Sequence, residues 1–566
     1  MKAGQQIMSE EPQNNQQTTS AGFQPLRNTN KESSSKDKMI EGSAWMTAGS
    51  IFSRILGAIY IIPWVIWFGS MSDNANALFA KGYNIYSFFL IAAIAGIPSA
   101  IAKQVAHYNT INEFAVGQRL YKRGLLLSGA TGIICALILY FGAPVLSSGD
   151  VNVIPILHSL AWAVLVIPTM SLTRGFFQGY QEMAPSAISQ FVEQLARVVY
   201  MLVTAFLIMK VQHGNWVSAV SQSTFAAFIG AIGGMLVLVF YYLRHRSRLR
   251  ELAQNSKQEL AIPTKQLYKE IIAQATPFII IGSAITIFQL IDQYSFFSIM
   301  NHVFNYSTSL VNTLYADFAF NSNKLVMIVV SLGSAMAITA VPMLSEAKTR
   351  GDKREINSQI TDALLLFAFF MIPAALGMAA VAQPLNTLFY HYDVVGTSIL
   401  EVSAYVSVIL GLFTVISAIM QGVSENVRAV AYFAIGVVVK LVLQYPLVAY
   451  LGAMGPILST GIGFCVVSWL ILRHLNQEYG IGFKRMSKPI SGILGFSLLT
   501  FIVAFAVVRL AYLFLDPYSK MIAVVVCVLA ACLGGFVYLY ATLKTRLADV
   551  MLGSRVERIR RLLRIH

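Results

Sequence analysis

Long apolar runs separated by short polar segments extend along almost the whole chain from residue 44 onwards. A helix of about 20 apolar residues crosses a bilayer core about 30 Å thick. Irregular backbone is excluded from lipid because its polar groups would stay unsatisfied. The pattern therefore predicts an all-α polytopic membrane protein with fourteen transmembrane helices. Their expected positions are 44–68, 82–105, 124–146, 154–175, 184–209, 216–242, 271–297, 324–344, 360–382, 397–420, 428–450, 452–472, 489–512 and 521–543.

The distribution of Lys and Arg predicts the orientation of these helices. If the N-terminus is cytoplasmic, 33 of the 41 basic residues fall on cytoplasmic segments, and the opposing loops 144–153, 298–323 and 383–396 contain none. Cytoplasmic loops of membrane proteins are enriched in Lys and Arg. We therefore expect both termini in the cytoplasm. Residues 1–40 are rich in Gln, Asn, Ser and Lys, so we expect a disordered terminus there, with no signal peptide.

Two similar motifs indicate an internal repeat. Residues 178–182 read QGYQE and residues 421–425 read QGVSE, and each motif is followed at the same spacing by a basic residue, Arg197 or Lys440. Pro98 and Pro342 repeat at almost the same offset. Each half then holds six helices, and an even number gives two lobes related by a pseudo-two-fold axis along the membrane normal. The predicted parts are 1–40 (disordered N-terminus), 41–243 (N-lobe), 244–270 (basic cytoplasmic loop), 271–473 (C-lobe), 474–543 (helices 13 and 14) and 544–566 (basic cytoplasmic tail).

Composition removes several function classes. Apolar residues make up 56% of the chain and charged residues 12%, about half the usual charged share of a soluble protein. The net charge of +15 is explained by topology, so we expect no nucleic-acid partner. All four cysteines lie within apolar spans and no metal-ligand spacing occurs, so we expect no metal site. No hydrolase or nucleotide-binding motif is present, which argues against an enzyme.

Charged residues inside membrane helices are costly and therefore mark candidate sites. Arg54, Arg197 and Lys440 come from helices of both predicted lobes, and a cleft between the lobes lined by them would bind an anion such as a phosphate or diphosphate. Three further candidates complete the predicted substrate site, which then comprises Arg54, Arg197, Lys440, Glu193, Asp292 and Lys324. Glu193 and Arg197 are four residues apart on one helix and can pair, either as a structural unit or as part of the site.

Two prolines and the basic tail are interpreted as structural elements rather than as parts of the substrate site. Bends at Pro98 and Pro342 would act as hinges that let the lobes rock. The tail 544–566 interleaves arginines with Val and Leu, which is typical of an amphipathic segment on an anionic membrane surface.

Several motifs resemble the polysaccharide-type flippases of the multidrug/oligosaccharidyl-lipid/polysaccharide (MOP) superfamily. Residues 174–179 read RGFFQG and 183–190 read MAPSAISQ, followed by Glu193, Gln194 and Arg197. The same group is matched by 53–57 (SRILG), 96–103 (GIPSAIAK) and 452–460 (GAMGPILST). The resemblance covers about residues 40–545 and is strongest to the Gram-positive branch of the lipid II flippases. Where the proteobacterial branch has an arginine six residues after the Arg54 position, this chain has Tyr60.

The resemblance implies a bacterial plasma-membrane flippase. It implies two lobes around a cationic cavity, alternating access, a lipid-tail groove beside helices 13 and 14, and an undecaprenyl-diphosphate-linked sugar-peptide as substrate. We expect a monomer without cofactor, driven by membrane potential, Na⁺ or H⁺. Two alternatives stay open at this point: a flippase for another polyprenyl-linked polysaccharide, and a cation-coupled multidrug exporter, which would place Asp and Glu in the cleft instead.

Overall fold

The computed structural model describes residues 56–552 except 58, 95, 96, 181 and 257–275, together with residues 556 and 560. All regular structure in this part of the chain is helical. Residues before 56, most of the basic loop and most of the tail lie outside the described residues, as does Arg54. The N-terminal half consists of α2 (Ile61–Phe68), η1 (Gly69–Met71), α3 (Ser72–Ile94), α4 (Ile97–Thr110), α5 (Phe114–Phe141), α6 (Ala143–Leu146), α7 (Val153–Gly179), α8 (Ala184–Phe206), η2 (Leu207–Val211) and α9 (Trp216–Gln254).

The second half begins with a short helix, Thr276–Gly282, which meets α11 at a bend of 57°. The C-terminal half continues with α11 (Ala284–Val303), α12 (Thr308–Ala316), η3 (Asp317–Ser322), α13 (Asn323–Arg350), α14 (Lys353–Ala380), α15 (Ala382–Phe389), α16 (Val394–Gly422), α17 (Asn426–Leu451), η4 (Gly452–Met454) and α18 (Gly455–Tyr479). It is followed by α19 (Phe483–Ala511), α20 (Lys520–Lys544) and α21 (Leu547–Leu552).

The described helices confirm a multi-pass membrane protein. Ten are long and apolar enough to cross a bilayer, and the bent pair before and including α11 makes up to eleven. Large apolar side chains are exposed on the outer faces of these helices, as on α5, where Leu126 is 75% exposed, and on α20, where Phe536 is 62% exposed. Such faces suit contact with lipid tails, because the hydrocarbon phase imposes no cost on them.

Buried polar residues explain two of the places where the predicted boundaries were wrong. Helix α3 begins at Ser72 rather than at residue 82, because Asn76 and Lys81 are bonded within the protein and their polarity conceals the helix. The predicted loop 298–323 is largely helical. Ser307 caps α12 by accepting a hydrogen bond from the Leu310 amide, and η3 connects α12 directly to α13.

Two tight turns between helices require glycine. Gly69 joins α2 to α3 at φ 55°, and Gly452 joins α17 to α18 at φ 56°. A side chain disfavours this left-handed region of backbone space. Each glycine therefore lets the chain reverse within a three-residue 3₁₀ turn, η1 or η4, without a long loop at the membrane boundary.

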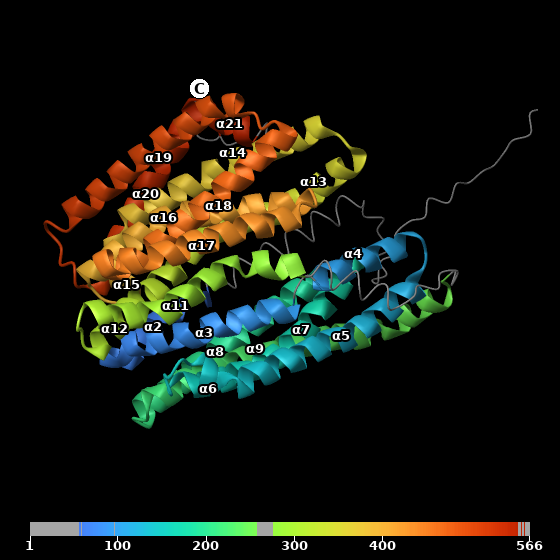
Figure 1. Cartoon of the computed structure of the whole chain (residues 1–566), viewed down its shortest axis with the longest axis horizontal. Helices are drawn as coiled ribbons and strands as arrows, with labels where there is room; N and C mark the ends of the chain where they lie inside the picture. Colours follow the sequence, from blue (N-terminus) through green and yellow to red (C-terminus); the bar gives the residue numbers. More distant parts are fainter. Residues whose placement is uncertain are drawn as a thin grey trace, which may run out of the picture.

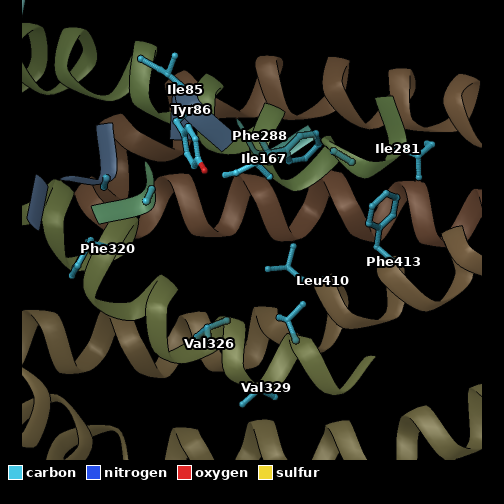
Figure 2. Close-up of a cluster of buried hydrophobic side chains, with 14 of the residues drawn as sticks. Ile85, Tyr86, Ile167, Ile281, Phe288, Phe320, Val326, Val329, Leu410 and Phe413 are labelled. Carbon is cyan, nitrogen blue, oxygen red and sulfur yellow. The ribbon is translucent and has the colours of Figure 1, made fainter. Parts of the chain in front are cut away.

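The two halves lie side by side and share one apolar core (Figure 1). Figure 2 shows part of it, where Tyr86 of α3 and Ile167 of α7 lie near Phe288 of α11, with Leu410 and Phe413 of α16 on the C-terminal side. Helices α19 and α20 pack outside this core, against α14 and α15. Tyr538 of α20 anchors them by donating a hydrogen bond of 2.8 Å to the Phe369 carbonyl.

Candidate functional site

The two halves are hydrogen-bonded at one end, which we call the joined end: residues 74–84 and Leu146 on one side, and 293–321 on the other. Asn76 lies at its centre. Its Oδ1 accepts a hydrogen bond of 2.9 Å from Trp64 Nε1, and its Nδ2 donates one of 2.9 Å to Asn321 Oδ1. Buried amides gain most when all their groups are paired. The joined end is therefore a specific polar contact within an otherwise apolar interface.

Lys81 strengthens the same end. Its ammonium lies 2.8 Å from Asp150 Oδ2 and 3.4 Å from Asn312 Oδ1, and 4.0 Å from the centre of the Phe297 ring. This one side chain thus ties α3 to the loop before α7 and to α11 and α12. Its charge is balanced within the protein, so it is not available to bind a substrate.

A cavity of about 350 Å³ lies between the halves. Its described lining comes from Gly57 and Ile61 on one side and from α13 on the other, and it includes the cationic side chain of Lys324. The α13 residues that line it are Lys324, Leu325, Met327, Ile328, Ser331 and Ser334. None of these lining residues is acidic, so the described wall of the cavity is positively charged.

Lys324 is surrounded by aromatic rings. Its ammonium lies 5.2 Å from the ring centres of Phe79 and Tyr83 and 5.3 Å from that of Phe320. Among the described residues it makes no ion pair within 4 Å. Ring faces stabilise a cation without neutralising it. The charge of Lys324 therefore stays available to an anion that enters the cavity.

Arg197 approaches the same place from α8. Its guanidinium donates a hydrogen bond of 3.0 Å to the Tyr83 hydroxyl and lies 5.8 Å from the centre of that ring. Tyr83 of α3 thus contacts both Arg197 of the N-terminal half and Lys324 of the C-terminal half. The tyrosine brings two of the predicted site residues together, although no sequence signal singled it out.

The expected Glu193–Arg197 pair is not formed. Glu193 instead accepts a hydrogen bond of 2.8 Å from Arg174 of α7, whose guanidinium also donates to Ser189 Oγ. Spacing along one helix allows a pair but does not exclude a better-placed partner on a neighbouring helix. Arg174 was overlooked as a partner although it opens the RGFFQG motif. With Glu193 engaged elsewhere, Arg197 keeps its positive charge toward Tyr83.

Lys440 and Asp292 lie apart from this cavity. The Lys440 side chain is completely buried in the C-terminal half, and its ammonium is 2.6 Å from Asp292 Oδ1. Lys440 is not among the described residues that line the Lys324 cavity. The expectation that Lys440 shares a cleft with Arg197 is therefore not supported. Of the predicted hinges, Pro98 is the second residue of α4 and Pro342 lies within α13.

Comparisons with known proteins identify the family of this chain. The family model described as polysaccharide biosynthesis protein matches residues 39–348. The lipid II flippase MurJ of Bacillus subtilis (strain 168) is 35% identical over 543 residues, which cover 92% of this chain and 97% of that protein. The uncharacterized membrane protein YabM of the same strain is 24% identical and covers 92% of this chain and 96% of that protein.

Solved structures show the same fold at low sequence identity. The inward closed conformation of lipid II flippase MurJ matches with a TM-score of 0.54 at 15% identity, covering 87% of this chain and 98% of that one. An outward-facing multidrug resistance MATE family transporter of the MOP superfamily matches with a TM-score of 0.59 at 15% identity, covering 78% and 96%. The chain therefore belongs to the polysaccharide biosynthesis protein family, and it is a homologue of the lipid II flippase MurJ with the MOP-transporter fold.

Proposed function

We propose that this protein is a flippase that moves lipid II, an undecaprenyl-diphosphate-linked peptidoglycan precursor, from the inner to the outer leaflet. The observation that carries the proposal is its 35% identity to a lipid II flippase across almost the full length of both chains. The cationic wall of the cavity between the halves supports an anionic substrate. A transporter needs a binding cavity and two access states rather than catalytic groups, so we propose no enzymatic activity and no cofactor.

Within this function, Lys324 and Arg197 bind the diphosphate, together with Arg54, which precedes α2 in the chain. Arg and Lys donate charge-assisted hydrogen bonds to phosphate oxygens. Glu193 has an indirect role: it is bonded to Arg174, and Arg197 forms no ion pair within 4 Å among the described residues. We assign Lys440 and Asp292 to the interior of the C-terminal half rather than to the diphosphate.

We further propose the complete fourteen-helix architecture. The ten spans include two hairpins, α2–η1–α3 and α17–η4–α18, each of which holds two helices. The bent pair ending in α11 and the long helix α13 supply the remaining two. Contacts repeat between the halves: α8 packs on α9 as α17 does on α18, and α5 on α7 as α14 does on α16. This repetition supports two six-helix lobes with α19 and α20 outside them.

The orientation follows from charge. The turns between α4 and α5 and between α13 and α14 lie at the end opposite the joined end (Figure 1). Basic residues flank them, including Arg119, Arg350 and Lys353. The positive-inside rule places this end in the cytoplasm. We therefore propose that both termini are cytoplasmic, that the joined end faces outward, and that the protein works as a monomer in the bacterial plasma membrane.

Reconstitution tests the function. In proteoliposomes containing labelled lipid II, the full-length protein should make lipid II reach the opposite leaflet, scored by a headgroup-modifying reagent that does not cross the membrane. A second set of vesicles carries a polyprenyl-linked polysaccharide unit, and a third measures efflux of a cationic dye. Movement of the second substrate alone, or dye efflux alone, would replace the proposal with one of those activities.

Weakening the joined end should favour outward opening. Asn76→Ala leaves Trp64 Nε1 and Asn321 Oδ1 without their hydrogen-bond partner. Each buried polar group left unsatisfied costs about 1–3 kcal/mol of stability in the closed state. Cysteines at positions 74 and 312, whose native side chains lie 3.2 Å apart, report closure through a short bifunctional cross-linker, with Cys135, Cys465, Cys527 and Cys532 replaced by serine. Cross-linking should be slower with Asn76→Ala. Equal rates would mean that Asn76 does not hold this end closed.

A further inference from the structure

The Lys440 ammonium lies inside a cage of five oxygen atoms. Asp292 Oδ1 is 2.6 Å from it, Thr460 Oγ1 2.7 Å, Ser459 Oγ 3.1 Å, Gln444 Oε1 3.2 Å and the Pro456 carbonyl 3.3 Å. The oxygens come from three helices: α11, α17 and the first turns of α18. The Lys440 side chain is 0% exposed and the Asp292 side chain 9%, so the charged pair at the centre of this cage is buried.

The cage has more oxygens than an ammonium can satisfy. A lysine ammonium has three N–H donors, whereas five oxygens lie within 3.3 Å of Nζ. One carboxylate, an amide, a backbone carbonyl and two hydroxyls are hard oxygen ligands, the kind that unhydrated metal cations take. Three of the five oxygens, those of Pro456, Ser459 and Thr460, come from the first turns of α18, which follow the turn η4.

A small cavity lies beside the cage. Asp292, Pro456 and Thr460 also line a cavity of about 70 Å³, together with Asn84 of the N-terminal half. This space is large enough to admit water, so a small ion could reach the cage if the ammonium were removed. Asn84 in turn donates a hydrogen bond to Gln293 at the joined end, so the cavity beside the cage borders the contact between the halves.

We propose that Lys440 is a built-in cation that permanently fills a monovalent-cation site, so that this protein takes up no free Na⁺ there, and that the same cage binds Na⁺ once the amino group is removed. Transport is then independent of a Na⁺ gradient at this site, because the charge is covalently attached and cannot exchange with solution. The inference concerns the ion and not the substrate, and it stands whether or not lipid II is moved.

The test uses thermal unfolding of the full-length protein in nanodiscs, in NaCl and in choline chloride at equal concentration. The unaltered protein should unfold at the same temperature in both salts. Lys440→Ala should unfold at a lower temperature in choline, and Na⁺ should raise that temperature by about 2–5 °C, because a ligand that binds only the folded state stabilises it. Binding of ²²Na⁺ should follow the same pattern.

Two matched variants separate a true site from a general salt effect. Asp292→Asn combined with Lys440→Ala removes the carboxylate and should abolish the Na⁺ response. Lys81→Ala also removes a lysine from an aspartate. Among the described residues, Asp150 and Asn312 alone supply side-chain oxygens to Lys81, so Na⁺ should have no specific effect.

Three results would overturn the proposal: Na⁺-specific stabilisation or ²²Na⁺ binding in the unaltered protein, a Na⁺ response of Lys440→Ala no larger than that of Lys81→Ala, or a response that survives the loss of Asp292. If Lys440→Ala does not fold, Lys440→Gln takes its place. Its amide keeps a polar group in the cage without the charge, and the measurement on the unaltered protein decides independently.

Discussion

Asp292→Ala is expected to destabilise the protein by about 3–5 kcal/mol, the cost of leaving one member of a buried ion pair without its partner. The Lys440 ammonium would then face four uncharged oxygens while its side chain stays fully buried. The loss should be measured as the free energy of unfolding in mixed micelles of increasing SDS content. We expect expression to fall as well, because such a loss is a large part of total stability.

Removing both charges should restore much of this loss. In the double variant Asp292→Leu, Lys440→Met, no charge is left unpaired. Ser459 still donates to Gln444, and Gln444 to Ser295. We expect the double variant to be clearly more stable than Asp292→Ala. If the two are equally unstable, packing around Asp292 rather than charge neutralisation is what the aspartate provides.

Lys324→Met is expected to reduce lipid II translocation by about tenfold to a hundredfold while leaving the fold as stable as before, or more so. The charge-assisted hydrogen bonds of this cation to a diphosphate would contribute about 1.5–3 kcal/mol. Methionine has nearly the same length and needs no counter-ion, so it should pack well among Phe79, Tyr83 and Phe320. The initial translocation rate tests the expected loss of transport, and the unfolding temperature of the same preparation tests the expected stability.

Two control variants make the result specific. Lys324→Arg keeps the charge and should retain most of the translocation rate. Lys210→Met removes an exposed lysine at the end of η2 and should change neither quantity. If Lys324→Met transported at the normal rate, Lys324 would have no role in substrate binding. A parallel fall in rate and stability would assign it to the fold instead.

Much of the helical architecture could be predicted from hydrophobic runs alone. Residues 124–146, 397–420 and 521–543 were expected as spans, and α5, α16 and α20 contain them, apart from the last residues of the first. The prediction was wrong at α3 and at α12 with the following η3, which carry buried polar residues such as Asn76 and Asp317. Hydropathy registers how polar a side chain is, but not whether another part of the chain satisfies it.

The sequence by itself determined that this is a membrane protein with few charges inside its helices, and its motifs indicated the family. Those properties depend on composition and on the order of residues along the chain. A long apolar run is stable in lipid only as a helix, because every backbone polar group must then be hydrogen-bonded within the segment. Only the tertiary structure decided which charges meet. Arg174 takes Glu193, Tyr83 joins Arg197 to Lys324, and Lys440 is enclosed by oxygens around Asp292. The physical reason is that electrostatic energy in a low-dielectric interior depends on distances of a few ångströms between separate helices, which no pattern along one helix can specify.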